Sequence, residues 1–161
     1  MATEVSPRVY EGGLSADGKK IAIVVSKFNQ AVTQKLLEGA LNCFRKHGAS
    51  DIEVFHCPGA YELPQVASFI TGIKKYDAVV CLGAVIRGET PHFDFICQEC
   101  ARGIGQVSQE RGIPVLFGVI TSNTFEQAME RAGGVVGNKG YDAALSAIEM
   151  SDLYSQIVSQ K

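Results

Sequence analysis

Several features that would place a chain in a special class of protein are missing from these 161 residues. No apolar run approaches the roughly 20 residues of a membrane-spanning helix, so no membrane partner is expected. The opening residues, MATEVSPRVYEGG, contain no apolar signal core, which argues against export. Lysine and arginine number 15 against 17 aspartates and glutamates, a net charge of −2. Because there is no basic excess, no nucleic acid is expected as a partner.

Cysteine is present in an odd number and in apolar surroundings, at positions 43, 57, 81, 97 and 100. This usage is typical of reduced thiols in a cytoplasmic protein rather than of a disulfide framework. Cys97 and Cys100 form a C-x-x-C pair, but no second pair lies at matching spacing. The pair falls within an apolar helical stripe, which favours core packing over metal binding. Sequence motifs for nucleotide cofactors are absent as well.

Apolar runs and helical spacings alternate along the chain. Residues 1–18 are polar with one proline and three glycines, which predicts a flexible or docking arm before a single domain at 19–161. Strands are predicted at 21–25, 52–56, 78–86 and 114–120. Helices are predicted around 36–44, 63–70, 93–107 and 125–132 and from 141 onward, with Gly48 and Gly112 ending the first and third. Strands joined by helix-length connections predict a three-layer α/β/α sandwich around four parallel strands.

Polar or aromatic residues follow each predicted strand, in the segments 26–29, 57–62, 87–92 and 121–124. Open parallel sheets bind ligands at the carboxyl ends of their strands, so we expect the four loops to face one mouth. Ser122, Asn123 and Thr124 are expected to be capping or turn residues. Phe28 is either a core residue or a stacking platform. Glu62 is either a first-turn carboxylate stabilised by the helix dipole or an acceptor for ligand hydroxyl and amide groups.

The stretch GAVIRGETPHFDF, residues 83–95, is the most specific of these loops. Thr90 suits an N-cap and Pro91 the first helical position, which places His92 in the first turn of a helix. The helix dipole disfavours a charged imidazole there, so His92 is expected to act as a neutral proton acceptor. Backbone N–H groups beside Gly88 can cradle an anion. The alternative is that His92 is an ordinary surface residue, and His47 and His56 are expected to be structural.

Two cations border a glycine-rich segment late in the chain. Arg131 precedes Gly133 and Gly134, and Lys139 lies in the sequence GNKG. An arginine at a helix end is ordinarily solvated and interacts with the dipole. If this loop faces a site, Arg131 can instead bind an anion through two parallel hydrogen bonds.

Taken together, these stretches resemble the lumazine synthase family of riboflavin biosynthesis. The matching segments are SKFN (26–29), LLEGAL (36–41), PGAYELP (58–64), GAVIRGETPHFDF (83–95), PVLFGVIT (114–121) and EQAMERAGGVVGNKG (126–140). The resemblance implies a flavodoxin-like sandwich. It also implies the condensation of 5-amino-6-(D-ribitylamino)uracil with 3,4-dihydroxy-2-butanone 4-phosphate to 6,7-dimethyl-8-ribityllumazine. Orthophosphate and water leave, and no metal or organic cofactor takes part.

The resemblance also implies a role for individual residues, with His92 as the proton-transfer group. Phe28 matches the residue that stacks on the pyrimidine, and its being Phe rather than Trp implies weak flavin binding. Glu89 places a carboxylate in the phosphate loop, where it must point away or pair with a cation. The substrate-binding set comprises Phe28, Asn29, Ala60, Tyr61, Glu62, Ala84, Val85, Ile86, Glu89, Thr90, Phe117, Arg131 and Lys139. Within it, Phe117 and Arg131 match groups given by an adjacent subunit, where Arg131 binds the phosphate, and Lys139 is a nearby cation.

Assembly is likewise an implication of the resemblance. It implies a homopentamer with sites between neighbouring subunits, and the compact segment 131–140 favours a 60-subunit icosahedral shell. Riboflavin synthase is a possible enclosed partner. Two other functions are considered on the same scaffold, a flavin-binding module and a catalytically inert shell-forming protein. The first leaves His92 and Arg131 without a role, and the second has no need of Phe28, Glu62, His92 and Arg131 together.

Overall fold

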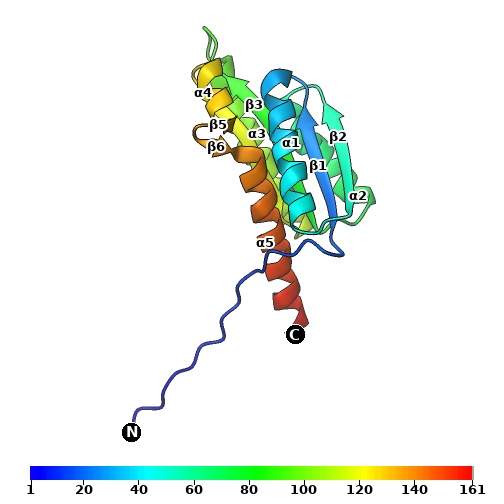
Figure 1. Ribbon diagram of the computed structural model, residues 1–161, viewed down its shortest axis with the longest axis vertical. Helices are drawn as coiled ribbons and strands as arrows, with labels where there is room; N and C mark the ends of the chain where they lie inside the picture. The colour runs from blue at the N-terminus through cyan, green and yellow to red at the C-terminus, as the bar shows by residue number, and fades with distance from the viewer. Residues whose placement is uncertain (161) are drawn as a thin grey trace.

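Four parallel strands form the centre of the fold, which we describe from a computed structural model covering residues 1–160. They are β1 (Lys20–Ser26), β2 (Asp51–Cys57), β3 (Ala78–Ile86) and β4 (Val115–Ser122), hydrogen-bonded in the order β2-β1-β3-β4. The chain winds outward from β1 in one direction and then crosses to β3 on its other side (Figure 1). The point between β1 and β3 is therefore the switch point of the sheet.

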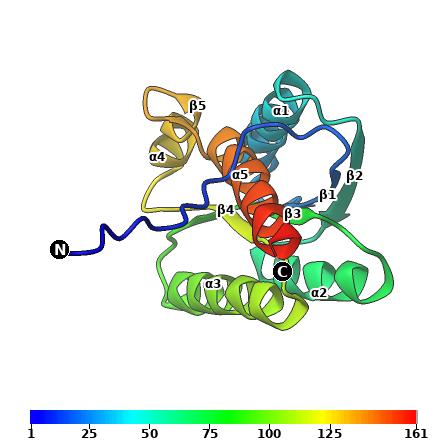
Figure 2. The same ribbon diagram turned by 90° about the horizontal axis from the view of Figure 1, so that it is seen from below.

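Helices cover both faces of this sheet. Helices α1 (Gln30–Lys46), α4 (Phe125–Glu130) and α5 (Lys139–Ser159) lie on one side, and α2 (Leu63–Ile73) and α3 (His92–Arg111) on the other (Figure 2). A short 3-10 helix, η1 (Ala60–Glu62), precedes α2. The arrangement confirms the predicted flavodoxin-like α/β/α sandwich with four parallel strands.

The core consists of two apolar layers, one on each face of the sheet. Alternate residues of β1 point to opposite faces, so Ile21 and Ile23 join the layer under α1 and α5. Ala22 and Val24 join the layer under α2 and α3. Because both faces are covered, β1 is buried along its length, which explains its unbroken apolar run,.

The last third of the chain departs from the prediction. The fourth strand begins at Val115 and continues to Ser122, because the residues expected to form a loop pair with the end of β3. The helix predicted to reach residue 132 ends at Glu130. The chain then forms a small antiparallel hairpin of β5 (Ala132–Gly134) and β6 (Gly137–Asn138). Strands of three and two residues are too short to show an alternation of apolar and polar residues, so no sequence pattern predicts them.

The start of α3 differs from the prediction by one residue. The helix begins at His92, with Pro91 rather than Thr90 at the N-cap position. The hydroxyl of Thr90 still accepts a long, 3.4 Å hydrogen bond from the backbone N–H of His92. At the other end, Gly112 caps the helix in the left-handed conformation at φ 67°, as predicted,.

The N-terminal arm consists of a free part and a docked part. The first residues extend away from the body of the molecule (Figure 1). From Glu11 onward the arm lies on α5, where the Gly13 N–H donates to Asp152 Oδ2 at 2.6 Å. That hydrogen bond lowers the pKa of Asp152 below its ordinary value. A side chain at Gly12 would collide with the Glu149 carbonyl, so the close approach of arm and helix requires glycine there,.

All five cysteines are free thiols, which agrees with the prediction of reduced cysteine. Cys100 is fully buried and packs in the core layer under α2 and α3. His47 has a structural role, since its Nδ1 lies 2.7 Å from the Cys43 carbonyl oxygen. His56 is exposed near the end of β2. Among the helices of residues 1–160, none combines the length and apolarity needed to cross a bilayer.

Candidate active site

A cavity of about 630 Å³ lies at the carboxyl ends of β1 and β3, at the switch point of the sheet. Its walls come from the residues after β1, from η1, from the end of β3, and from the loop and first turns of α3. This volume falls within the range of small-molecule sites. The loop after β4 does not line the cavity, so the prediction of four loops at one mouth is wrong for that loop. β4 is the outer strand, separated from the switch point by β3.

Phe28 and Asn29 form the wall next to β1. The Phe28 side chain is 71% exposed, which excludes a core position and leaves its ring as part of the cavity wall. Its backbone N–H donates to Pro58 O at 3.0 Å, so the loops after β1 and β2 are joined. Asn29 adopts a left-handed backbone conformation, φ 61°, and its side-chain Nδ2 donates to Ala84 O at 2.9 Å. This bond leaves Asn29 Oδ1 as the side-chain atom available to a ligand.

Glu62 is the carboxylate of the cavity, at the end of η1. Its backbone N–H donates to Gly59 O at 3.2 Å, and its side chain folds back over the same residue. A Cβ added at Gly59 would lie only 3.1 Å from Glu62 Oε2, so glycine leaves the carboxylate room to fold this way. Ala60, small and buried, lines the cavity between them. A carboxylate so placed can accept hydrogen bonds from hydroxyl or amide groups.

The end of β3 and the start of α3 supply the remaining walls. Ala84, Val85 and Ile86 line the cavity along β3, and His92 lines it from α3. A Cβ added at Gly88 would meet no atom within 4 Å, so the loop before His92 has open space around it. The imidazole of His92 thus lines the same cavity as the Phe28 ring and the Glu62 carboxylate.

The cavity collects most of the residues predicted to bind substrate. Nine of them line it: Phe28, Asn29, Ala60, Tyr61, Glu62, Ala84, Val85, Ile86 and Thr90. His92, the predicted proton-transfer residue, lines it as well. Four further lining residues, Gly59, Gly88, Phe93 and Ile96, were not in the predicted set. Phe93 and Ile96 fall within the helix that the sequence predicts at 93–107, where apolar residues are expected to face the core. Ile96 follows His92 by four positions, so both lie on the same side of α3. This spacing is the sequence signal that could have identified Ile96 as a lining residue.

Comparison with known proteins shows the family of the chain. The family model described as 6,7-dimethyl-8-ribityllumazine synthase matches residues 18–155 of the chain. The chain belongs to this family. A 6,7-dimethyl-8-ribityllumazine synthase from Chlorobium phaeovibrioides is 56% identical over 146 residues, covering 89% of this chain and 94% of that protein. The one from Desulfotalea psychrophila is 56% identical over 149 residues, covering 91% and 96%.

Four residues that the lumazine synthase resemblance places in substrate binding lie outside the cavity. Glu89 is exposed in the loop before α3. Phe117 is on the outer strand β4 and is 45% exposed. Arg131 follows α4, where its Nη1 donates to Gln127 O at 3.0 Å and lies 3.6 Å from Glu130 Oε2. Lys139 begins α5, and its backbone N–H donates to Arg131 O at 2.9 Å.

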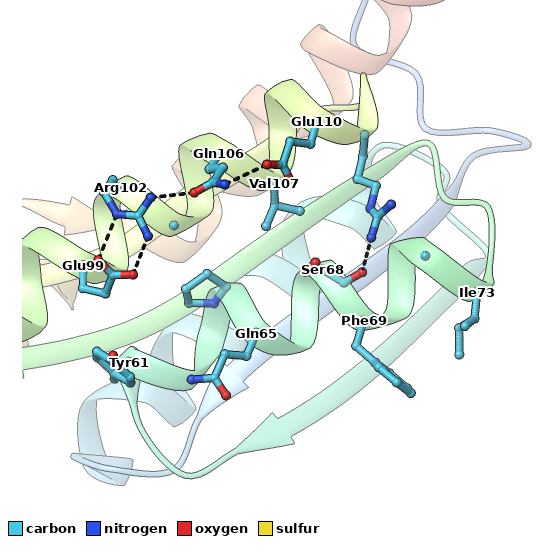
Figure 3. Close-up of a pocket in the computed structure, with 14 residues that line it drawn as sticks. Tyr61, Gln65, Ser68, Phe69, Ile73, Glu99, Arg102, Gln106, Val107 and Glu110 are labelled. Carbon is cyan, nitrogen blue, oxygen red and sulfur yellow. Dashed lines mark hydrogen bonds and ion pairs between the residues drawn. The ribbon is translucent and has the colours of Figure 1, made fainter.

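A second hollow, of about 610 Å³, runs between α2 and α3 (Figure 3). Along its α3 side, Arg102 pairs with Glu99 at 2.6 and 2.9 Å and also donates to Gln106. Gln106 in turn donates to Glu110 at 2.7 Å. These polar groups satisfy one another along a single helix and do not converge on the hollow. Within residues 1–160, no group of three His, Cys, Asp or Glu side chains is placed to hold a metal ion.

Proposed function

We propose that this chain condenses 5-amino-6-(D-ribitylamino)uracil with 3,4-dihydroxy-2-butanone 4-phosphate to give 6,7-dimethyl-8-ribityllumazine. Orthophosphate and water are released, and no metal or organic cofactor takes part. Family membership supports the reaction. The observation that carries the proposal is the meeting of an exposed ring, a carboxylate and an imidazole in one cavity, from Phe28, Glu62 and His92.

The pyrimidine substrate binds against the wall of the cavity that is formed by the loops after β1 and β2. The ring of Phe28 stacks on the pyrimidine, whose heterocycle offers an aromatic face. The carboxyl end of β3, at Ala84, Val85 and Ile86, lines the part of the cavity that holds the pyrimidine ring. Backbone groups near Ala60 and Tyr61, with the Glu62 carboxylate, receive the hydroxyl and amide groups of the substrate.

His92 moves the protons that the reaction requires. The amine nitrogen of the pyrimidine attacks the ketone, and loss of water gives an imine. Tautomerisation and departure of phosphate follow. The second amine nitrogen then attacks the remaining carbonyl to close the ring, and a second water leaves. Each of these steps transfers a proton. General acid–base catalysis of this kind contributes typically about 10²–10⁴-fold. Holding the two substrates face to face supplies the larger share of the acceleration.

The phosphate is bound where two subunits meet. Backbone N–H groups of the loop at Glu89 and Thr90 cradle the anion, with the Glu89 side chain turned away from it. Arg131 of a neighbouring subunit binds the phosphate and stabilises its departure. Phe117 and Lys139 are placed at the same junction. Because Phe117, Arg131 and Lys139 lie outside the cavity of their own chain, a shared site accounts for all three.

A shared site in turn requires an oligomer. We extend the proposal to a homopentamer of cytoplasmic subunits, each with an arm at residues 1–18 and a catalytic domain at 19–161. The compact segment 131–140, which forms the short β5–β6 hairpin, favours assembly into a 60-subunit shell. Riboflavin synthase is the proposed enclosed partner of that shell.

The test is turnover by the purified, assembled protein. The two substrates are mixed with it, and lumazine formation is followed by absorbance above the spontaneous background. A Phe28→Ala/Arg131→Ala double variant is expected to lose the acceleration. An Arg45→Ala variant, altered on the exposed end of α1, is the control and should match the parent protein. Assembled protein that gives no acceleration would contradict the proposal and point to a flavin-binding module or an inert shell.

A further inference from the structure

Arg87 connects three segments of the chain immediately after β3. Its Nε donates to Asn123 Oδ1 at 3.0 Å, beyond the end of β4. Its Nη1 lies 3.5 Å from Asp94 Oδ1 in the first turn of α3. Its guanidinium carbon lies 4.3 Å from the centroid of the Phe93 ring. The Arg87 side chain does not line the cavity, so any effect of Arg87 on a ligand there passes through the residues that it contacts.

Two of the three partners come immediately after His92, the proposed proton-transfer residue. Phe93 and Asp94 follow His92 directly, and the Phe93 ring itself lines the cavity. A guanidinium over an aromatic face attracts the ring electrostatically and holds its plane. Arg87 therefore contacts two side chains of the first turn of α3.

This turn is weakly held by its own backbone. The first N–H groups of a helix have no partner within the helix, and Pro91 has no N–H at all. The bond from the His92 N–H to Thr90 is long, at 3.4 Å, and Gly88 leaves the preceding loop permissive,. Within the turn the Asp94 N–H donates to Pro91 O at 3.0 Å, and the contacts with Arg87 add outside support that keeps its side chains in one position.

The same contacts continue to Arg131. The backbone N–H of Asn123 donates to Gln127 Oε1 at 2.9 Å. The carbonyl of Gln127 accepts the 3.0 Å hydrogen bond from Arg131 Nη1. Arg87 thus joins the turn that carries His92 to the segment that carries Arg131, through Asn123 and Gln127.

We propose that Arg87 is a positioning residue, which holds the first turn of α3 so that His92 and Phe93 face the substrate. The inference rests on the proposed function. Arg87 is expected to orient the turn and to add little to the stability of the fold, because an exposed ion pair such as Arg87–Asp94 contributes only about 0–1 kcal/mol. A lysine cannot replace it, since one ammonium lacks the planar fork that bonds Asn123 while stacking on Phe93.

The experiment compares Arg87→Gln and Arg87→Lys with Arg102→Gln in the full, assembled protein. Arg102 is the matched control, because it lies on α3 and loses an exposed pair with Glu99 in the same way. We expect both Arg87 variants to lower kcat about tenfold or more, since a small misplacement of a catalytic group is costly. Thermal midpoints should stay within a few degrees of the parent, and Arg102→Gln should leave kcat unchanged.

Asn123→Ala provides a second variant, which also covers the case in which Arg87→Gln does not fold. It should lower kcat in the same direction by a smaller factor. In the double variant the two effects should be less than additive, because Asn123 acts through the guanidinium that is already lost. Full additivity, wild-type turnover by Arg87→Gln, or restoration by Arg87→Lys would each overturn the inference.

Hydrogen exchange gives a readout that does not depend on turnover. The amides of residues 88–96 should exchange faster in Arg87→Gln and at the parent rate in Arg102→Gln. Unchanged exchange in that segment contradicts the positioning role. Lack of turnover by the parent protein, with faster exchange in Arg87→Gln, refutes the proposed function and leaves the positioning of the turn intact.

Discussion

The side-chain nitrogen of Asn29 donates a 2.9 Å hydrogen bond to the carbonyl oxygen of Ala84. The bond joins the ends of β1 and β3 across the switch point, where the cavity lies. Within residues 1–160, Asn29 is the only residue other than glycine with a positive φ, at 61°. Asparagine is one of the few residues that tolerates this conformation, and such strain is often found at functional sites. The wall of the cavity thus depends on a locally strained residue.

Replacing Asn29 in two ways separates its backbone role from its side-chain role. Asn29→Ala loses the hydrogen bond and keeps an unfavourable backbone, so unfolding should become easier by about 2 kcal/mol. Asn29→Gly loses the bond but relieves the strain, so its stability should stay within about 1 kcal/mol of the parent. Both should lose activity similarly, because Ala84 is no longer held. Urea denaturation and steady-state turnover measure the two effects, and equal stability of the variants would contradict this account.

His92→Ala should slow the condensation without abolishing it. The expected loss is about 10²-fold, within the range for a general acid–base group, while substrate positioning remains intact. The measurement is kcat against the spontaneous rate for the same substrates. A rate as low as the uncatalysed reaction would show that His92 does more than transfer protons.

Arg131→Ala should weaken binding of the butanone phosphate far more than binding of the pyrimidine. A guanidinium binds phosphate through charge-assisted hydrogen bonds, and the pyrimidine has no such group for it. KM values for the two substrates, each varied at saturating levels of the other, provide the comparison. Arg45→Ala serves as the surface control, and an equal rise in both KM values would rule out this assignment.

Two glycines give a matched pair for stability. A side chain at Gly140 would collide with the Leu36 carbonyl where α1 and α5 meet. Gly140→Ala should therefore lower the free energy of unfolding by about 3 kcal/mol. Gly105 is an exposed position within α3 where an added Cβ meets nothing within 4 Å. Gly105→Ala should raise stability by about 0.5–1 kcal/mol through helix propensity, and denaturant midpoints will test both signs.

Stability should fall in mildly alkaline solution because of the buried thiols. Burial raises the pKa of Cys43 and of Cys57 to about 11 and that of Cys100 to about 12. In the unfolded chain a thiol has a pKa of about 8.5. Above that pH the unfolded state therefore releases protons that the folded state keeps. The thiols' contribution is fully present below that pH and is lost as the pH rises toward 11.

The test is the denaturant midpoint of the parent and of Cys43→Ala at pH 7.5 and 10. The variant should be less stable at both values, because it leaves a cavity, but its midpoint should fall less between them. The same fall in both proteins would show that this thiol does not cause the pH dependence.

The α/β sandwich was predictable because its pattern is local. The unbroken apolar runs at β1 and β3 indicate strands that are buried on both faces. The connections between strands are long enough to form helices, which indicates that the strands pair in parallel. Phe28, Glu62 and His92 were predictable as site candidates, because each lies in the segment between a strand and the body of the next helix. The β5–β6 hairpin was not, since two very short strands carry no periodicity.

The sequence by itself determined which segments follow the strands and therefore which side chains could reach the ligand edge of the sheet. Only the tertiary structure decided which strand ends share a cavity, because strand order depends on packing between segments far apart in the chain. It placed β4 on the outside, brought Phe93 and Ile96 from the apolar stripe into the wall, and joined Arg87 to Asn123. Each of these depends on contacts between helices and strands that no local pattern encodes.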